Sequence, residues 1–139
     1  MADRIETGRT VVREMFGEQF LAALEGAGAS GDFGADAAKL ALGGAFGEVW
    51  GRPGLERKQR SFVTMGILIA LRTPVEFKNH VRAALANGCS VKEIEETIFQ
   101  AIPYAGFPAA AIALTAAAEV LRERGLFAGG KTAEERGLL

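Results

Sequence analysis

The 139-residue chain has only one cysteine, Cys89, and one histidine, His80. A single thiol cannot form an internal disulfide, a redox-active CxxC pair or a cysteine-rich zinc site, and one imidazole leaves little for a histidine-based metal centre. Neither sign of charge is in excess, because 16 Lys and Arg residues face 17 Asp and Glu residues and give a net charge of -1. The chain therefore has no cationic surplus for nucleic acid or for an anionic membrane.

Long hydrophobic runs are also missing. The longest apolar run, residues 65–71, is too short to cross a bilayer, and the charged N-terminal residues contain no apolar stretch typical of a secretory signal. We therefore expect a cytoplasmic protein. The length suits one globular domain, and we place it at residues 1–124, followed by a C-terminal tail at residues 125–139.

The residue pattern favours helices over strands. Alanine and leucine are frequent, β-branched runs are scarce, and apolar residues recur with helical spacing. We expect an all-α, single-domain bundle of about six to seven helices. The expected helices span about residues 3–16, 20–24, 35–46, 56–71, 74–87, 91–102 and 108–124.

Two helices have explicit start signals. Thr73 is followed three residues later by Glu76, and Ser90 is followed three residues later by Glu93. Each pair predicts an N-cap residue with a capping box, in which the glutamate returns a hydrogen bond to the cap. Pro103 is expected to kink or end the sixth helix, because proline cannot donate a backbone hydrogen bond.

His80 is the first candidate for chemistry. It lies on the apolar stripe of the fifth expected helix, with Phe77, Val81 and Ala84, so its imidazole is expected to point inward. Glu76, four residues earlier, is close enough to hold one ring nitrogen and leave the other to handle a proton. The alternative is a buried structural histidine satisfied by a neighbour, with Glu76 occupied in capping the helix.

A second candidate group lies in a glycine- and proline-rich stretch, residues 47–54, which we expect to be irregular. Here Glu48, Trp50 and Arg52 are close in sequence, and an aromatic ring with mixed charges can form the wall of a site for a small anion. The alternative is that Trp50 anchors the core and the two charged side chains lie on the surface.

The fourth expected helix, residues 56–71, is apolar nearly all round in its second half, as in a helix buried in a domain or in a subunit interface. Arg60 near its start can hold a carboxylate with two hydrogen bonds, or it can pair with Glu56 one turn earlier. Cys89 has no second thiol and no cationic cluster beside it, which indicates a structural thiol.

Several motifs occur in an order and spacing known from one protein family. They are GEVW at residues 47–50, RPGL at 52–55, RS at 60–61, HVRAA at 80–84, NG at 87–88, EIEE at 93–96 and YAGFPAA at 104–110. With these motifs the chain resembles the 4-carboxymuconolactone decarboxylase family over roughly residues 3–124. The resemblance implies an all-α, alkylhydroperoxidase-like fold that assembles into a homo-oligomeric ring, a hexamer or a trimer.

The resemblance also implies the reaction. Family members remove CO2 from the small carboxylated lactone 4-carboxymuconolactone and give the β-ketoadipate enol-lactone, a step of protocatechuate catabolism, with no metal or organic cofactor. Related alkylhydroperoxidases carry Cys-x-x-Cys-x-x-x-His at the equivalent helix. This chain keeps His80 but has Thr73 and Glu76 at the two cysteine positions, which excludes thiol peroxidase chemistry.

For a decarboxylase, the catalytic candidates are His80, as proton donor or oxyanion partner, and Glu48 or Glu76, either of which tunes the imidazole. Arg52 or Arg60 is expected to bind a substrate carboxylate. These assignments follow from the resemblance together with the side-chain chemistry.

Trp50 and Phe107 are expected to supply an apolar wall of the substrate site. The chain departs from the usual family pattern at Pro103, Phe107 and Ala111. One alternative is therefore a family paralogue that acts on another small lactone or carbonyl-activated carboxylic acid. Another is a non-catalytic oligomeric protein that binds a small anion.

Overall fold

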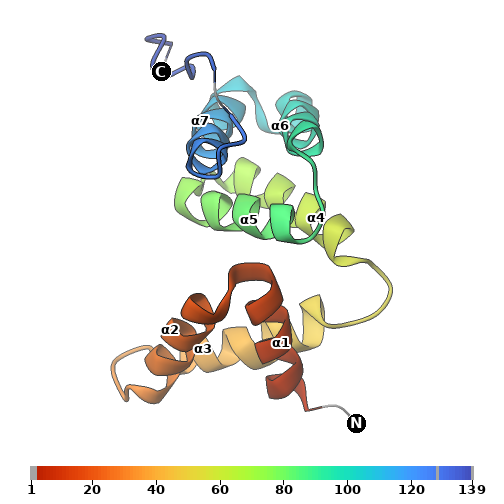
Figure 1. Ribbon diagram of the computed structural model, residues 1–139, viewed down its shortest axis with the longest axis vertical. Helices are drawn as coiled ribbons and strands as arrows, with labels where there is room; N and C mark the ends of the chain where they lie inside the picture. Colours follow the sequence, from red (N-terminus) through yellow and green to blue (C-terminus); the bar gives the residue numbers. More distant parts are fainter. Residues whose placement is uncertain (1–2, 128, 139) are drawn as a thin grey trace. The chain divides into compact units, whose positions relative to one another are not determined.

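The computed structural model describes residues 3–127 and 129–138, and every regular element in these ranges is helical (Figure 1). The all-α expectation is confirmed. The elements are α1 (Arg4–Phe16), α2 (Glu18–Ala29), α3 (Ala35–Leu40), the π-helix η1 (Ala41–Trp50), α4 (Arg57–Leu71), α5 (Pro74–Ala86), α6 (Val91–Ala105) and α7 (Phe107–Glu123). No helix within the described ranges has the length and apolar character needed to cross a membrane.

The chain forms two compact units, Met1–Arg57 (unit 1) and Lys58–Leu139 (unit 2). Unit 1 consists of α1, α2, α3 and η1. The side chain of Asp3 caps α1 by accepting a hydrogen bond from the Ile5 backbone N–H at 2.9 Å. The core of this unit is built on Val12, Leu21 and Leu42, which bury their apolar side chains between these helices.

The π-helix η1 continues α3 without a break. Glycines on both helices allow the backbone of α1 to pack directly against the backbone of η1. An ideal Cβ at Gly47 would lie 2.1 Å from the Arg4 carbonyl oxygen, and one at Gly8 would lie 2.0 Å from the Leu42 carbonyl oxygen. The prediction of a helix ending at residue 46, followed by an irregular stretch at 47–54, is therefore wrong for residues 47–50. These glycines provide a contact surface, and the helix ends only at Trp50.

Unit 2 contains α5, α6 and α7 together with the length of α4 that follows Arg57 (Figure 1). Its apolar core includes Met65, Ile69, Phe77, Val81, Ile94, Ile98, Ala113 and Val120, all at most 2% exposed. Two ion pairs join α5 to α7. Lys78 pairs with Glu119, and Arg82 pairs with Glu123 at 3.1 Å.

One of the two predicted helix caps is confirmed. The Ser90 hydroxyl accepts from the Glu93 backbone N–H at 3.0 Å, and the Glu93 carboxylate accepts from the Ser90 N–H at 2.9 Å. The other prediction is confirmed only for position, because Thr73 is the N-cap residue of α5 but its side chain makes no cap hydrogen bond, so the predicted capping box is wrong. Its hydroxyl donates instead to the Leu68 carbonyl at 3.3 Å, since Arg72, with φ 54°, turns the chain back over the end of α4.

The sequence predicts that Pro103 either kinks or ends the sixth helix, and in the structure it does not end it. It lies inside α6, which continues to Ala105. The helix ends at Gly106, whose φ of 93° is a conformation that side-chain-bearing residues rarely adopt. Pro103 lacks the N–H that would donate to the carbonyl four residues earlier, so α6 continues with one intrahelical hydrogen bond fewer.

The C-terminal segment, residues 125–138 without 128, folds back on α7. Arg122 is the anchor: it forms an ion pair with Glu135, donates to the Gly130 carbonyl at 3.0 Å and lies 5.1 Å from the centre of the Phe127 ring. Thr132, 9% exposed, exchanges two hydrogen bonds with Glu135. These contacts attach the predicted C-terminal tail to α7.

Candidate active site

The predicted site residues are divided between the two units. Unit 1 contains Glu48, Trp50 and Arg52, and unit 2 contains Arg60, Glu76, His80 and Phe107.

His80 lies on α5 as its sequence pattern predicted. Phe77, Val81 and Ala84 on the same stripe are at most 1% exposed, and the Nδ1 atom of His80 is buried. Burial lowers the pKa of His80 below its usual 6.5, and the negative charge of Glu76 one turn earlier opposes this with a smaller effect. The neutral imidazole is therefore the favoured form at pH 7.

Glu76 lies exposed in the first turn of α5. The alternative role for Glu76 was a capping box with Thr73. The half of that box that Thr73 would form is missing, because its side chain makes no cap hydrogen bond. In the structure, the negative charge of Glu76 acts to raise the pKa of the His80 imidazole.

Arg60 belongs to α4, and its Nε atom is buried although the residue as a whole is only half-buried. The next residue, Ser61, is fully buried, and its hydroxyl accepts a hydrogen bond from the Asn87 side-chain amide at 2.9 Å. Sequence reasoning missed this pair. A small hydroxyl residue on the buried face of an apolar helix was the signal that could have found one half of it.

Phe107 is the first residue of α7 and is 73% exposed. Tyr104, at the end of α6, is 86% exposed. Both rings are thus available for contact with another molecule.

The unit 1 residues lie at the end of η1. Glu48 is exposed and accepts a hydrogen bond from the exposed Arg4 side chain at 2.9 Å, which fits the surface-charge alternative. Trp50 is half-buried as the last residue of η1, and Arg52 is exposed in the turn that follows.

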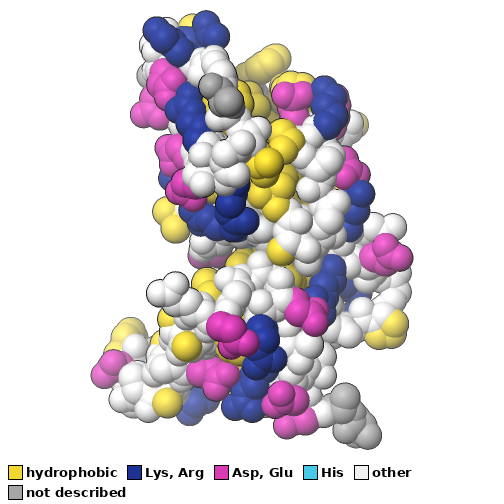
Figure 2. Space-filling view, viewed as in Figure 1, with side chains coloured by type: hydrophobic (Ala, Val, Ile, Leu, Met, Phe, Trp, Pro, Cys, Tyr) yellow, Lys and Arg dark blue, Asp and Glu magenta, His cyan; other side chains and the backbone are white. Residues whose placement is uncertain are grey.

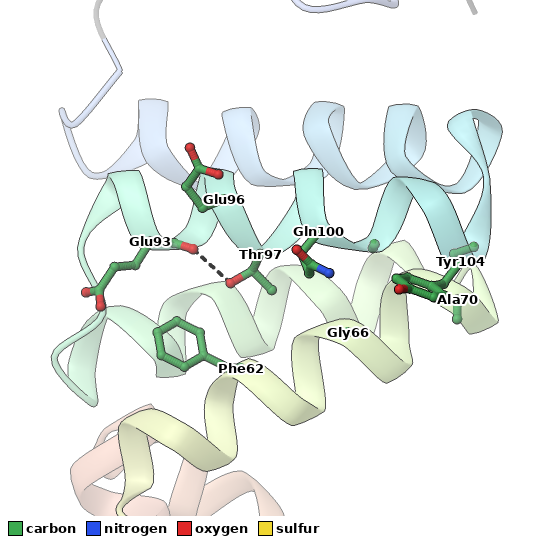
Figure 3. A pocket seen from close by; sticks show the side chains of 10 residues that line it. Phe62, Gly66, Ala70, Glu93, Glu96, Thr97, Gln100 and Tyr104 are labelled. Carbon is green, nitrogen blue, oxygen red and sulfur yellow. Dashed lines mark hydrogen bonds between the residues drawn. The ribbon is translucent and has the colours of Figure 1, made fainter.

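A cavity with a volume of about 650 Å³ lies in unit 2 between α4 and α6 (Figure 3). Its lining includes Phe62, Gly66 and Ala70 from α4 and Glu93, Glu96, Thr97, Gln100 and Tyr104 from α6. In Figure 3 the Phe62 ring points from α4 toward α6. None of the seven predicted site residues lines this cavity.

The charges around this cavity do not suit an anionic substrate. Its lining includes Glu93 and Glu96, and no Lys or Arg is among the lining residues that the structure describes. A hydrogen bond from the Ser90 backbone and one from Lys58 lower the pKa of Glu93, so this carboxylate is ionised at neutral pH. Lys58 pairs with Glu93 at 2.9 Å and Lys92 pairs with Glu96 at 3.3 Å, and none of the described lining residues supplies a positive charge for a substrate carboxylate.

A second cavity, of about 240 Å³, lies between α6, α7 and the C-terminal segment. Figure 2 shows apolar side chains gathered between α6 and α7, with charged side chains around them. Phe127 and Thr132 of the C-terminal segment form one of its walls.

Two further groups bear on the chemistry. Burial raises the pKa of the Cys89 thiol, which disfavours the reactive thiolate and agrees with a structural role. Among the described residues, no group of three or more His, Cys, Asp or Glu side chains is arranged to hold a metal ion.

Comparison with known proteins gives a consistent result. Residues 35–119 match the model of the carboxymuconolactone decarboxylase family. A protein of Acinetobacter baylyi named 4-carboxymuconolactone decarboxylase is 38% identical over 124 residues, which cover 88% of this chain and 90% of that protein. A nitrosuccinic acid decarboxylase of Metarhizium robertsii is 45% identical over 64 residues, 46% of this chain and 45% of that protein. An uncharacterised 15.0 kDa protein of Paracoccus denitrificans is 41% identical over 81 residues, 56% of this chain and 60% of that protein.

Proposed function

The chain belongs to the carboxymuconolactone decarboxylase family, and from this premise we propose that it is a carboxy-lyase that removes CO2 from 4-carboxymuconolactone and gives the β-ketoadipate enol-lactone. The observation that carries the proposal is 38% identity over nearly the full length of both chains to a protein named for this activity. The proposal places the reaction in the cytoplasm, in the catabolism of protocatechuate.

The substrate supplies its own electron sink. Loss of the carboxylate leaves an electron pair that spreads through the ring double bond to the lactone carbonyl, so the reaction needs no pyridoxal or thiamine group. The protein must then bind the carboxylates, stabilise the dienolate oxygen and deliver a proton to carbon.

We assign the dienolate oxygen to His80. Burial favours its neutral imidazole, and a neutral ring N–H can donate a hydrogen bond to an oxygen that gains charge in the transition state. Glu76 opposes the effect of burial on this ring, and Arg60 supplies a fixed positive charge for a substrate carboxylate.

The sequence prediction names Glu48 as the alternative to Glu76 for tuning the imidazole and Arg52 as the alternative to Arg60 for binding a carboxylate. It assigns the apolar wall to Trp50 and Phe107. We keep these roles as part of the proposal. An Arg52→Ala variant should raise KM more than it lowers kcat, because its role is substrate binding.

The test is CO2 release from 4-carboxymuconolactone by the purified protein. His80→Asn should lower kcat/KM by about 100-fold or more, the scale expected when a group that acts on the reacting atoms is lost. Ala86→Ser, at an exposed position on the same helix, is the matched control and should keep full activity. Full turnover by His80→Asn would refute the role of His80, and no turnover by folded wild-type protein would refute the substrate.

A second candidate function is decarboxylation of another activated carboxylic acid. The specific observation in its favour is the match over 64 residues to a nitrosuccinic acid decarboxylase. Both acids tested side by side would separate the two candidates, because each predicts the larger kcat/KM for its own substrate.

We further propose that the protein is a homo-oligomer, a trimer or a hexamer. The support comes from α4, where Val63, Ile67 and Leu71 are 56%, 54% and 64% exposed and form one stripe at four-residue spacing. Light scattering should give a multiple of the 14.7 kDa chain mass. Ile67→Glu should reduce that multiple and Ala86→Glu should not, whereas a wild-type monomer would refute the proposal.

A further inference from the structure

Ser61, which is buried, and Asn87, which is half-buried, form a polar contact in unit 2. Ser61 is 0% exposed, and the Asn87 side-chain amide donates to its hydroxyl at 2.9 Å across 26 residues of sequence. A buried hydroxyl is costly without a partner and neutral or favourable with one. The hydrogen bond satisfies the buried hydroxyl, and because its two partners lie on different elements it also fixes their relative position.

The contact ties together two consecutive helices. Ser61 lies in the second turn of α4, and Asn87 is the residue that ends α5. At the other end of this helix pair, Thr73 donates from its N–H and its hydroxyl to the Leu68 carbonyl, at 3.2 Å and 3.3 Å. The α4–α5 pair is therefore held by directional hydrogen bonds at both ends.

The two helices carry three of the proposed active-site residues, Arg60 on α4 and Glu76 and His80 on α5. Arg60 directly precedes Ser61 on α4. On α5, His80 and Asn87 are seven residues apart, which places them on one face of the helix at a separation of roughly 10 Å along its axis. The position of α4 along α5 consequently sets how Arg60 and His80 lie relative to each other.

We propose that the Ser61–Asn87 hydrogen bond is a positioning contact for the decarboxylation, which fixes α4 against α5 and so holds Arg60 in place relative to His80. Apolar packing alone permits small sliding of one helix along another, whereas a hydrogen bond is lost when its atoms move by about 1 Å. The inference rests on the proposed function, and neither Ser61 nor Asn87 touches the substrate in it.

The kinetic test uses Ser61→Ala, Asn87→Ala and the double variant. Each single change should lower kcat by about tenfold or more, since a displacement of about 1 Å can cost up to 100-fold. The double variant should lose no more than the larger single effect, because both changes remove one contact. Additive losses, or unchanged kcat in both folded single variants, would overturn the proposal.

Two control variants separate positioning from stability. Ser61→Thr keeps the hydroxyl and should keep kcat, even where its additional methyl group lowers the melting temperature. Ile98→Val removes a buried methyl group on α6, a helix that takes no part in the Ser61–Asn87 hydrogen bond. It should lower stability without lowering kcat. A fall in kcat for Ile98→Val as large as that for Ser61→Ala would overturn the proposal.

A structural readout makes the test independent of the substrate. His80 is the one histidine in the sequence, so its ring signals in an NMR titration are assigned without ambiguity. Ser61→Ala should move the titration midpoint of His80, and Ile98→Val should not. If the wild-type protein failed to release CO2, the proposed function would fall, and an unmoved midpoint in Ser61→Ala would overturn the positioning contact separately.

Discussion

Gly47→Ala tests the close crossing of α1 and η1 directly. The added Cβ would lie 2.1 Å from the Arg4 carbonyl oxygen, whereas nonbonded heavy atoms prefer a separation of about 3.5 Å. The two helices must therefore move apart by roughly 1 Å, and overpacking of this kind costs about 1–3 kcal/mol. A cost of about 3 kcal/mol should lower the melting temperature, measured by far-ultraviolet circular dichroism, by roughly 10 °C.

Gly44→Ala is the matched control, because Gly44 lies in the same π-helix and a Cβ there meets nothing within 4 Å. Alanine is a better helix former than glycine by up to about 1 kcal/mol, so this variant should melt at the wild-type temperature or slightly above it. Gly8→Ala, whose Cβ would lie 2.0 Å from the Leu42 carbonyl oxygen, should behave like Gly47→Ala. Equal melting temperatures for the Gly44 and Gly47 variants would refute the close backbone contact between α1 and η1 at Gly47.

Three further predictions concern unit 2. Ser90→Ala should lower the free energy of unfolding by about 1 kcal/mol in urea titrations, and Thr73→Ala should lower it less, because only Ser90 caps its helix. Burial lowers the pKa of His80 in the folded chain, so the unfolded chain binds more protons once the pH drops through its own value of 6.5, and stability falls from there until the pH reaches the lower folded value. His80→Gln should lack this acid-side loss when melting is compared at pH 7 and pH 5. Arg122→Ala should speed amide hydrogen exchange in the C-terminal segment, and Arg124→Ala should not; equal exchange in both would contradict the anchoring role of Arg122.

Local signals in the sequence were reliable where the structure itself is local. Ser90 and Glu93 are three residues apart, and the capping box needs nothing beyond them. Thr73 shows the same pattern, yet its side chain follows the turn at Arg72 and bonds to Leu68. Nothing in the helix propensities reports the positive φ of an arginine, so this difference was beyond sequence reasoning.

The contacts that cross between helices were harder to predict. The stripe of apolar residues placed His80 on the inner face of α5, because burial follows helical periodicity. The sequence prediction ends this helix before Gly47, since the role of that glycine depends on α1, more than thirty residues away. The bond between Ser61 and Asn87 was missed for the same reason.

The winding of η1 has a consequence for changes in chain length. In a π-helix each backbone hydrogen bond joins residues five apart, whereas in an α-helix it joins residues four apart. Each turn of η1 therefore contains more residues than a turn of an α-helix. Loss of one residue from an α-helix rotates everything beyond it by about 100°. Loss of one residue from η1 can instead be absorbed by tightening a turn to α geometry. We therefore expect single-residue gaps among relatives of this protein to fall between Ala41 and Trp50 more often than within α5 or α7.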